Sequence, residues 1–480
     1  MTAAVLAMPA TNTLDAEVRR VFEKQFATAI QLRRSTAAER IAKIKKLRDS
    51  VLAHSADFYA AMAADFKKPA VEVDLTEILP VVAEANDTMR KLKKWMKPTG
   101  VWPTMLTGGL KSYVQYEPRG RCLIVAPWNY PINLCFVPLV SALAAGNTAM
   151  IKPSEMTPNT TAVIAKIIKE CFAEDEVAVF EGDANVSTAL LALPFDHIFF
   201  TGSPAVGKVV MTAAAKNLTS VTLELGGKSP TIVDETADID LAARNILWGK
   251  FTNCGQTCIA PDHVFVHESV KQAFIDKASA ALRNAYGATP EAQRSCVDLA
   301  HVVNQRHSQR LAGLLDDAKA KGAKVLTGGQ VDVADQWVAP TLLTDIPADA
   351  KIMSEEIFGP LLPIIGFSSL QNVIDEINRN PKPLALYFWS TKEANIKKVM
   401  QETTAGGTCI NHTVVHYLHN NLPFGGVNNS GIGSAHGIYG FKAFSHERAV
   451  IRTRFMVAKI FFPPYTSFMK KFVAMILKMV

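Results

Sequence analysis

The sequence predicts an α/β protein in which a parallel sheet is covered by helices on both faces. Short apolar runs have the length of buried strands, at 121–126, 148–151, 177–180, 196–200 and 221–225. Helix-forming segments such as 160–171 lie between them. This alternation is typical of parallel sheets, which bind ligands at the carboxyl ends of their strands. A chain of 480 residues is too long for one core and suits two or three domains.

The segments around these strands are predicted in order along the chain. Residues 15–97 form helices, because apolar residues such as Val18, Val21 and Phe22 recur at helical spacing. Residues 111–117 alternate as a strand, and the helix over 131–145 ends at Gly146. A second alternating region covers about 230–420, and the glycine-rich stretch 423–440 is predicted to be irregular.

Composition excludes several classes of function. The net charge of +7 is diluted over 480 residues without a long basic block, so no nucleic-acid partner is expected. The seven cysteines are an odd, scattered set, which favours a reducing cytoplasm over a disulfide framework. They lack the partner spacing of a zinc site, so we expect no metal. We see no secretory signal and no membrane-spanning segment.

The C-terminal tail is a basic amphipathic segment. Residues 467–480 follow Pro463 and Pro464, and Lys470, Lys471 and Lys478 fall on one side of a helix. Such a helix would be about 21 Å long, too short to cross a bilayer core of about 30 Å. Two interpretations stay open. The tail lies on a membrane surface, or it packs on a partner subunit or over the substrate entrance.

Several short motifs carry a resemblance to a known family. They lie at 127–131, 152–155, 200–207, 223–230, 251–258, 355–360 and 423–426. The most specific reads Phe-Thr-Asn-Cys-Gly-Gln-Thr-Cys and ends at Cys258. Together and in this order the motifs closely resemble the aldehyde dehydrogenase superfamily over about residues 15–455. Residues 256–262 and 422–427 resemble its class 3 branch, and 200–207 with 221–230 are most similar to bacterial coniferyl-aldehyde dehydrogenases.

The resemblance implies a domain organisation and a setting. It implies a Rossmann-like NAD(P)-binding domain and a second α/β catalytic domain with the nucleophilic cysteine. It also implies a small bridging or oligomerisation element, followed by the amphipathic tail. The NAD(P)-binding domain covers 1–100 and 120–223, and the catalytic domain covers 224–420. The bridging or oligomerisation element covers 101–119 and 421–455, and the tail covers 456–480. A cytoplasmic homodimer is expected, with membrane association of the tail left open.

Aldehyde oxidation needs a nucleophile, and the resemblance assigns it to Cys258. A thiolate adds to the aldehyde carbonyl, a hydride leaves to the nicotinamide, and water hydrolyses the thioester that remains. The alternative for any single cysteine is a buried apolar role. We keep that alternative for Cys254, which is expected to be structural.

Two further residues complete the expected catalytic set. The resemblance implies that Asn129 donates to the tetrahedral oxyanion together with the Cys258 backbone N–H. Its alternative role is to cap the helix that starts near Pro131. Glu224 lies at the end of an apolar strand, where burial would raise its pKa toward that of a useful base for thioester hydrolysis. Its alternative role is a buried salt bridge.

Seven residues are expected to contact the cofactor. Gly202, Ser203 and Gly207 lie where a strand leads into a helix, which suits a pyrophosphate at the helix N-terminus. By resemblance, Lys152 and Glu155 contact the adenosine ribose. The nicotinamide ribose is assigned in the same way to Glu356 and Phe358. Glu155 favours NAD, and Lys152 keeps NADP possible.

The expected activity is NAD(P)-dependent oxidation of an aldehyde to its carboxylic acid. Coniferyl aldehyde is the best single substrate, and medium- or long-chain aliphatic aldehydes are the alternative, because bacterial relatives of this kind often take aliphatic aldehydes. One alternative is a reductive or CoA-acylating relative that passes the thioester to another acceptor. An alternative from a different class is a non-catalytic scaffold, which retention of Cys258 and Glu224 argues against.

Overall fold

A computed structural model of the chain describes residues 11–104, 107, 109–453 and 462–478. The first part is helical, as predicted. Its elements are α1 (Thr11–Leu32), α2 (Ala37–Ala53), α3 (Ser55–Phe66), α4 (Ala70–Val73), the π-helix η1 (Asp74–Ile78) and α5 (Leu79–Trp95). Helix α2 begins at a capping box between Thr36 and Glu39, and Leu47 and Val51 on its inner face are buried.

A six-stranded sheet forms the core of the first half, in the order β17-β7-β6-β3-β4-β5. Its parallel strands are β3 (Arg121–Val125), β4 (Thr148–Lys152), β5 (Val177–Val179), β6 (His197–Gly202) and β7 (Ser220–Leu225). Strand β17 (Gly431–Ile432) adds antiparallel to β7. The chain fills one side of β3 with β4 and β5 and then the other with β6 and β7. The order therefore reverses between β3 and β6, where parallel sheets bind ligands.

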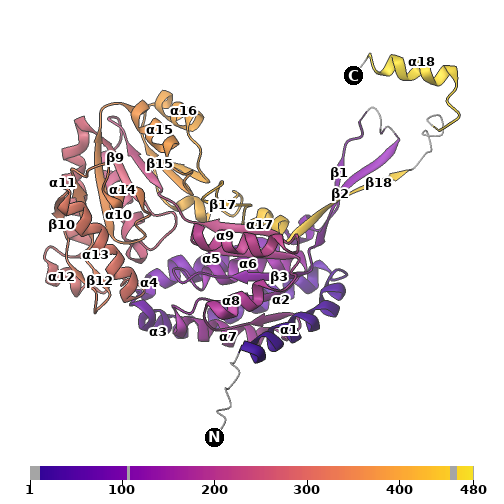
Figure 1. The fold of residues 1–480 in the computed structure, drawn as a ribbon, viewed down its shortest axis with the longest axis horizontal. Helices are drawn as coiled ribbons and strands as arrows, with labels where there is room; N and C mark the ends of the chain where they lie inside the picture. The colour runs from indigo at the N-terminus through magenta and orange to yellow at the C-terminus, as the bar shows by residue number, and fades with distance from the viewer. Residues whose placement is uncertain (1–10, 105–106, 108, 454–461, 479–480) are drawn as a thin grey trace, which may run out of the picture.

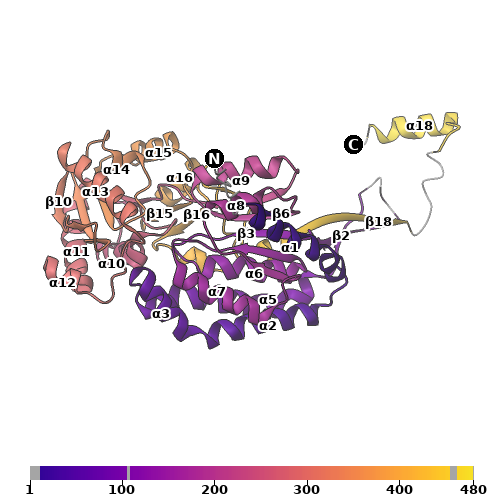
Figure 2. The ribbon, with the colours of Figure 1, turned by 60° about the horizontal axis from the view of Figure 1, so that its bottom comes forward.

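Helices cover both faces of this sheet (Figures 1 and 2). They are α6 (Asn133–Ala145), α7 (Pro158–Cys171), α8 (Ala184–Leu191) and α9 (Pro204–Ala215). Alternate residues of β3 face different cores. Ile124 packs with residues of α2, α5, α6 and α7, whereas Leu123 packs with α1, α8 and α9. The sheet is therefore buried on both faces, which explains the uninterrupted apolar runs in the sequence.

A seven-stranded sheet forms the second half, in the order β10-β13-β14-β9-β8-β15-β16. Its strands are β8 (Pro230–Val233), β9 (His263–His267), β10 (Lys324–Thr327), β13 (Thr341–Thr344), β14 (Leu361–Phe367), β15 (Ala385–Trp389) and β16 (Gly407–Ile410). The larger helices around it are α10 (Ile239–Phe251), α11 (Glu268–Tyr286), α13 (Gln305–Ala320), α15 (Leu370–Arg379) and α16 (Glu393–Glu402). Shorter elements are α12 (Pro290–Arg294), α14 (Lys351–Ser354) and the hairpin of β11 (Val331–Asp332) and β12 (Trp337–Val338). Only β10 runs antiparallel to its neighbour in this sheet.

A three-stranded antiparallel arm projects from the body (Figure 1). It consists of β1 (Thr99–Val101), β2 (Leu110–Pro118) and β18 (Ser445–Thr453), of which β2 lies within the segment 101–119 and β18 within 421–455. Other parts of 421–455 contact the first half of the chain. Strand β17 completes the first sheet, and Phe441 of α17 (Gly437–Ala443) packs on Trp95 of α5.

The described part of the tail is helical. Helix α18 (Ser467–Ile476) begins at Thr466, whose hydroxyl accepts the Met469 N–H, and both views place it beyond the arm. The tail residues 456–461, 479 and 480 lie outside the described ranges. In the described part of the chain, none of the helices combines the length and the apolar character that crossing a bilayer requires.

Candidate active site

Cys258 follows a turn with an unusual backbone. After α10, the 3₁₀ turn Thr252–Gly255 holds Asn253, Cys254 and Gly255 at φ values of 56°, 55° and 73°. At Gly255 a Cβ would lie 2.3 Å from the Gly359 carbonyl oxygen, so only glycine fits there. At non-glycine residues this left-handed conformation costs about 1–2 kcal/mol each. The surrounding contacts must therefore hold the turn in place.

Amide side chains tie this turn to the loop after β3. Asn129 Nδ2 donates to the Gln256 carbonyl oxygen at 3.0 Å, and Asn253 Nδ2 donates to the Asn129 carbonyl oxygen at 2.9 Å. Gln256 in turn donates to the His301 carbonyl oxygen at 3.0 Å. The capping alternative for Asn129 is wrong. Helix α6 begins at Asn133 with no side-chain cap, and the Asn129 amide contacts the cysteine loop instead.

Glu224 lies buried at the end of β7, opposite Gly431 of β17. Both of its carboxylate oxygens are buried without a hydrogen-bond partner among the described residues. The buried salt-bridge alternative is therefore wrong. Burial raises the pKa of Glu224 well above its ordinary value, because the charged form loses hydration without compensation.

Cys258 and Glu224 open onto one cavity of about 200 Å³. Most of the other residues around it are apolar or aromatic: Leu75, Leu79, Pro80, Tyr130, Leu134, Val137, Pro138, Phe199, Trp248, Ile259, Leu384, Val414, Tyr417, Leu418 and Phe424. Leu75, Trp248 and Leu418 are each about half exposed, so the outer part of this lining is apolar as well. Sequence reasoning missed these residues, because their motifs are not distinctive and they come from widely separated segments of the chain, among them 75–80, 130–138 and 414–424.

The cavity favours a protonated thiol at rest. Burial raises the pKa of Cys258 to about 12, and the nearby Glu356 and Glu224 carboxylates add to the effect. His436 also lines the cavity, and burial lowers its pKa to about 4. Cys254 is fully buried in the apolar core, as its expected structural role requires. A base or a nearby positive charge must therefore help Cys258 to react.

The expected adenosine and pyrophosphate contacts lie along one edge of the first sheet. Strands β4 and β6 both pair with β3, so Lys152 and Gly202 end at the same edge. Lys152 forms an ion pair with Glu155. Ser203 caps α9 by accepting the Val206 N–H, and a Cβ at Gly207 would lie 2.7 Å from Leu225. The close packing of α9 on β7 at Gly207 and the N-terminus of α9 at this edge are both features that suit the pyrophosphate of a dinucleotide.

The expected nicotinamide contacts lie in a loop between the two sheets. The Phe358 ring lies 5.4 Å from the Trp128 ring, beside the Asn129 turn. Glu356 packs against Gly226, where a Cβ would lie 2.5 Å from its carboxylate. Arg310, which sequence reasoning missed, donates to the Glu356 and Ile357 carbonyl oxygens and holds this loop.

Comparison with known proteins agrees with this geometry. Residues 4–450 match the model of the "Aldehyde dehydrogenase family". Aldehyde dehydrogenase family 3 member A2 of Mus musculus is 42% identical over 409 residues, which cover 85% of this chain and 83% of that protein. The "Probable coniferyl aldehyde dehydrogenase" of Caulobacter vibrioides is 40% identical over 442 residues, or 90% of each chain.

A solved structure agrees over nearly the whole chain. The substrate-bound state of Staphylococcus aureus AldH superposes with a TM-score of 0.91 at 41% identity, covering 96% of this chain and 99% of that one. The family match, the sequence identity to these relatives and the shared fold therefore agree. The chain belongs to the aldehyde dehydrogenase family, and it is an NAD(P)-dependent enzyme that oxidises aldehydes to carboxylic acids.

Proposed function

We propose that Cys258 is the nucleophile of this enzyme, Glu224 its hydrolytic base and Asn129 an oxyanion donor. The observation that carries the proposal is the shared cavity. Cys258 and an unpartnered, buried Glu224 carboxylate both line it, and the Asn129 amide contacts the cysteine loop two residues before Cys258. A buried carboxylate without a partner is costly unless it has a chemical task.

The residues divide the reaction between them. The Cys258 sulfur bonds to the aldehyde carbon as the thiol proton passes to solvent water, and the Asn129 amide with the Cys258 N–H stabilises the oxyanion. NAD or NADP, when bound, would supply the hydride acceptor, and loss of the hydride from the carbon of this adduct would leave a thioester on Cys258. Glu224 then takes a proton from water as the water oxygen attacks the thioester carbon. The C–S bond breaks, the carboxylic acid leaves, and the proton held by Glu224 passes to the sulfur, which restores both the thiol and the carboxylate.

For the cofactor, the proposal favours NAD. Glu155 would accept a hydrogen bond from the ribose 2′-hydroxyl, and its charge would repel a 2′-phosphate. Lys152 pairs with Glu155 and could contact that phosphate instead, so NADP stays possible. Gly202, Ser203 and Gly207 would hold the pyrophosphate at α9. Glu356 and Phe358 would hold the nicotinamide ribose.

For the substrate, we propose an apolar aldehyde, either aromatic such as coniferyl aldehyde or medium- to long-chain aliphatic. The cavity lining is mostly apolar, and its half-exposed residues Leu75, Trp248 and Leu418 extend that character outward. The name of the Caulobacter relative supports the aromatic choice. Glu224 in the cavity disfavours a CoA-acylating relative, which needs no hydrolytic base, and the intact Cys258 and Glu224 disfavour a scaffold.

For assembly, we propose a cytoplasmic homodimer that uses the β1-β2-β18 arm. Helix α18 would lie on a membrane surface or on the partner subunit. It exposes Phe468, Met475 and Leu477 alongside Lys470 and Lys471. Apolar side chains beside lysines suit an anionic lipid surface. Co-sedimentation with anionic vesicles, lost on removal of residues 467–480, would support the lipid surface, and its absence would favour the subunit.

A kinetic comparison of two cysteine variants tests the catalytic proposal. Purified protein is mixed with NAD and benzaldehyde or decanal, and NADH absorbance is followed. Cys258→Ala should abolish NADH formation while NAD still binds, and the matched control Cys254→Ala should keep most activity. Substantial turnover by Cys258→Ala would show that another group is the nucleophile.

A further inference from the structure

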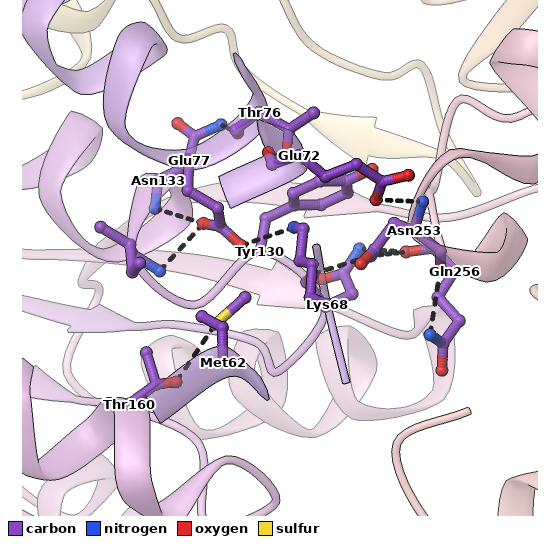
Figure 3. Close-up of polar contacts among 12 residues, drawn as sticks. Met62, Lys68, Glu72, Thr76, Glu77, Tyr130, Asn133, Thr160, Asn253 and Gln256 are labelled. Carbon is purple, nitrogen blue, oxygen red and sulfur yellow. Dashed lines mark hydrogen bonds and ion pairs between the residues drawn. The ribbon is translucent and has the colours of Figure 1, made fainter. Parts of the chain in front are cut away.

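The short segment from Ala70 to Ile78 contacts both the substrate cavity and the two loops that carry the proposed catalytic groups. It consists of α4 and the π-helix η1. Leu75 and Thr76 line the cavity. Glu72 and Glu77 of the same segment accept hydrogen bonds from backbone N–H groups of those two loops (Figure 3).

Glu77 anchors the loop that holds Asn129. Its fully buried carboxylate accepts the Ile132 N–H at 3.2 Å and the Asn133 N–H at 3.0 Å. These amides belong to the start of α6, where helix N–H groups lack intrahelical partners and favour a negative charge. Lys68, also fully buried, lies 2.9 Å from the other carboxylate oxygen and balances its charge.

Glu72 contacts the other loop, 181 residues away in the sequence. Its carboxylate accepts the Asn253 N–H at 2.9 Å. Asn253 is the first of the three left-handed residues before Cys258, with a φ of 56°. A strained backbone of this kind persists only where its surroundings hold it. The Glu72 carboxylate is a direct contact between the cavity-lining segment and this strained turn.

The π-helix explains how one short segment reaches both loops. In an α-helix, residues five apart differ by about 140° around the axis and face different sides. Here the Leu79 N–H donates to the Asp74 carbonyl oxygen, an i→i+5 bond that widens the turn and reduces that angle. Glu72 and Glu77 can then bond neighbouring loops, and π-turns of this kind occur frequently at functional sites.

A second connection runs through Tyr130. Lys68 Nζ lies 4.2 Å from the centre of the Tyr130 ring, and the Tyr130 hydroxyl hydrogen-bonds to Thr257 Oγ1 at 2.6 Å. Thr257 directly precedes Cys258. The two loops are therefore also joined at Thr257, after the turn, whereas the Glu72 carboxylate accepts the backbone N–H of the strained residue Asn253 itself.

We propose that Glu72 is a positioning residue for catalysis. By accepting the Asn253 N–H it holds the left-handed turn, and with it the Cys258 thiol, against the Asn129 loop that Glu77 anchors. Glu72 acts through Asn253 and is not among the residues that line the cavity. This inference rests on the proposed roles of Cys258 and Asn129. Without the acceptor the turn can relax, and a misplacement of about 1 Å can slow a reaction by about 100-fold.

Single-turnover kinetics of two Glu72 variants test this role. Glu72→Ala removes the acceptor, whereas Glu72→Gln keeps an oxygen that can accept the same N–H. We expect Glu72→Ala to slow the first NADH formation by about 10- to 100-fold. NAD affinity, measured by fluorescence, and the thermal midpoint should change little. Glu72→Gln should recover most of the rate. Asp74→Ala is the matched control, because the Asp74 side chain on the same segment accepts a hydrogen bond from the Tyr59 hydroxyl, and among the described residues it makes no bond to either loop.

Three results would overturn the inference: a normal first turnover in Glu72→Ala, equal slowing in Glu72→Gln, or equal slowing in Asp74→Ala. If Glu72→Ala does not fold, Glu72→Met keeps the side-chain length without an oxygen and should show the same slowing. Failure of the underlying catalytic proposal is distinguishable. In that case Cys258→Ala itself would still turn over, whatever Glu72 does.

Discussion

Replacing Glu224 by glutamine should separate the two halves of the proposed reaction. Thiol addition and hydride loss do not need the carboxylate in this scheme, but thioester hydrolysis does. Glu224→Gln should therefore produce about one NADH per active site and then stall, because the acyl-enzyme accumulates. Glutamine has nearly the shape of glutamate, so the cavity should keep its form.

The expected decrease in the steady-state rate of Glu224→Gln depends on whether another group around the cavity can act as a base. Tyr130 and Tyr417 are buried, which raises their pKa well above the ordinary value and keeps them protonated. The pKa of His436 is lowered to about 4 by burial, so its neutral ring is a weak proton acceptor. With no comparable base among these groups, the steady-state rate should fall by about 100- to 10,000-fold, the usual contribution of a general base.

Stopped-flow measurement of NADH absorbance with benzaldehyde checks this expectation. The wild type should show continuous turnover, and Glu224→Gln a burst followed by a plateau. Mass spectrometry of the stalled protein should find an acyl group on Cys258. Steady-state turnover close to wild type would refute the assignment of the base. A variant without a burst would show that Glu224 acts before hydride loss.

Three further predictions follow from buried groups and from the cavity lining. Burial raises the pKa of Glu224 above 4.5, so the folded state is favoured when Glu224 is protonated. This contribution of Glu224 to the free energy of unfolding is lost as the pH rises through the raised pKa. Glu224→Gln should therefore melt higher than wild type at pH 8, and this gain should shrink toward pH 4, as calorimetry can show. Glu77→Gln leaves Lys68 charged and buried, which should destabilise the fold by about 3–5 kcal/mol in denaturant unfolding. Adding Lys68→Met should recover most of that loss, and no recovery would contradict the pairing. Leu75→Lys in the half-exposed part of the cavity lining should raise KM for decanal several-fold, since each buried methylene contributes roughly 0.8 kcal/mol, with benzaldehyde little affected as the control.

The sequence predicted the first sheet well because buried parallel strands carry a simple signal. The apolar runs at 121–126 and 196–200 correspond to β3 and β6, within one or two residues at their ends. Gly146 ends α6 in the left-handed conformation, with a φ of 87°, as its position indicated. These features depend on neighbours in the chain, which a single sequence displays.

The rest of the site depends on contacts between distant segments. Glu224 and Asn129 each had a plausible structural alternative, and only the fold shows that neither alternative applies. The contact of Glu72 with Asn253 and the cavity lining from Leu75 and Leu418 leave no periodic pattern in the sequence. The roles assigned to Lys152, Glu155, Glu356 and Phe358 remain predictions, to be tested by cofactor-binding measurements on variants.

Glu77 and Glu224 show how this chain gives the same residue type opposite tasks. Both carboxylates are buried, and burial raises the pKa of each. For Glu77 the Lys68 ammonium and two backbone N–H groups oppose that shift, so its charge is compensated and its lone pairs are committed to holding a loop. For Glu224 no such partner is found among the described residues, so its oxygens are free to receive a proton inside the cavity. The difference lies in the donors that the fold supplies, and it is why Glu77 suits a structural anchor and Glu224 a base.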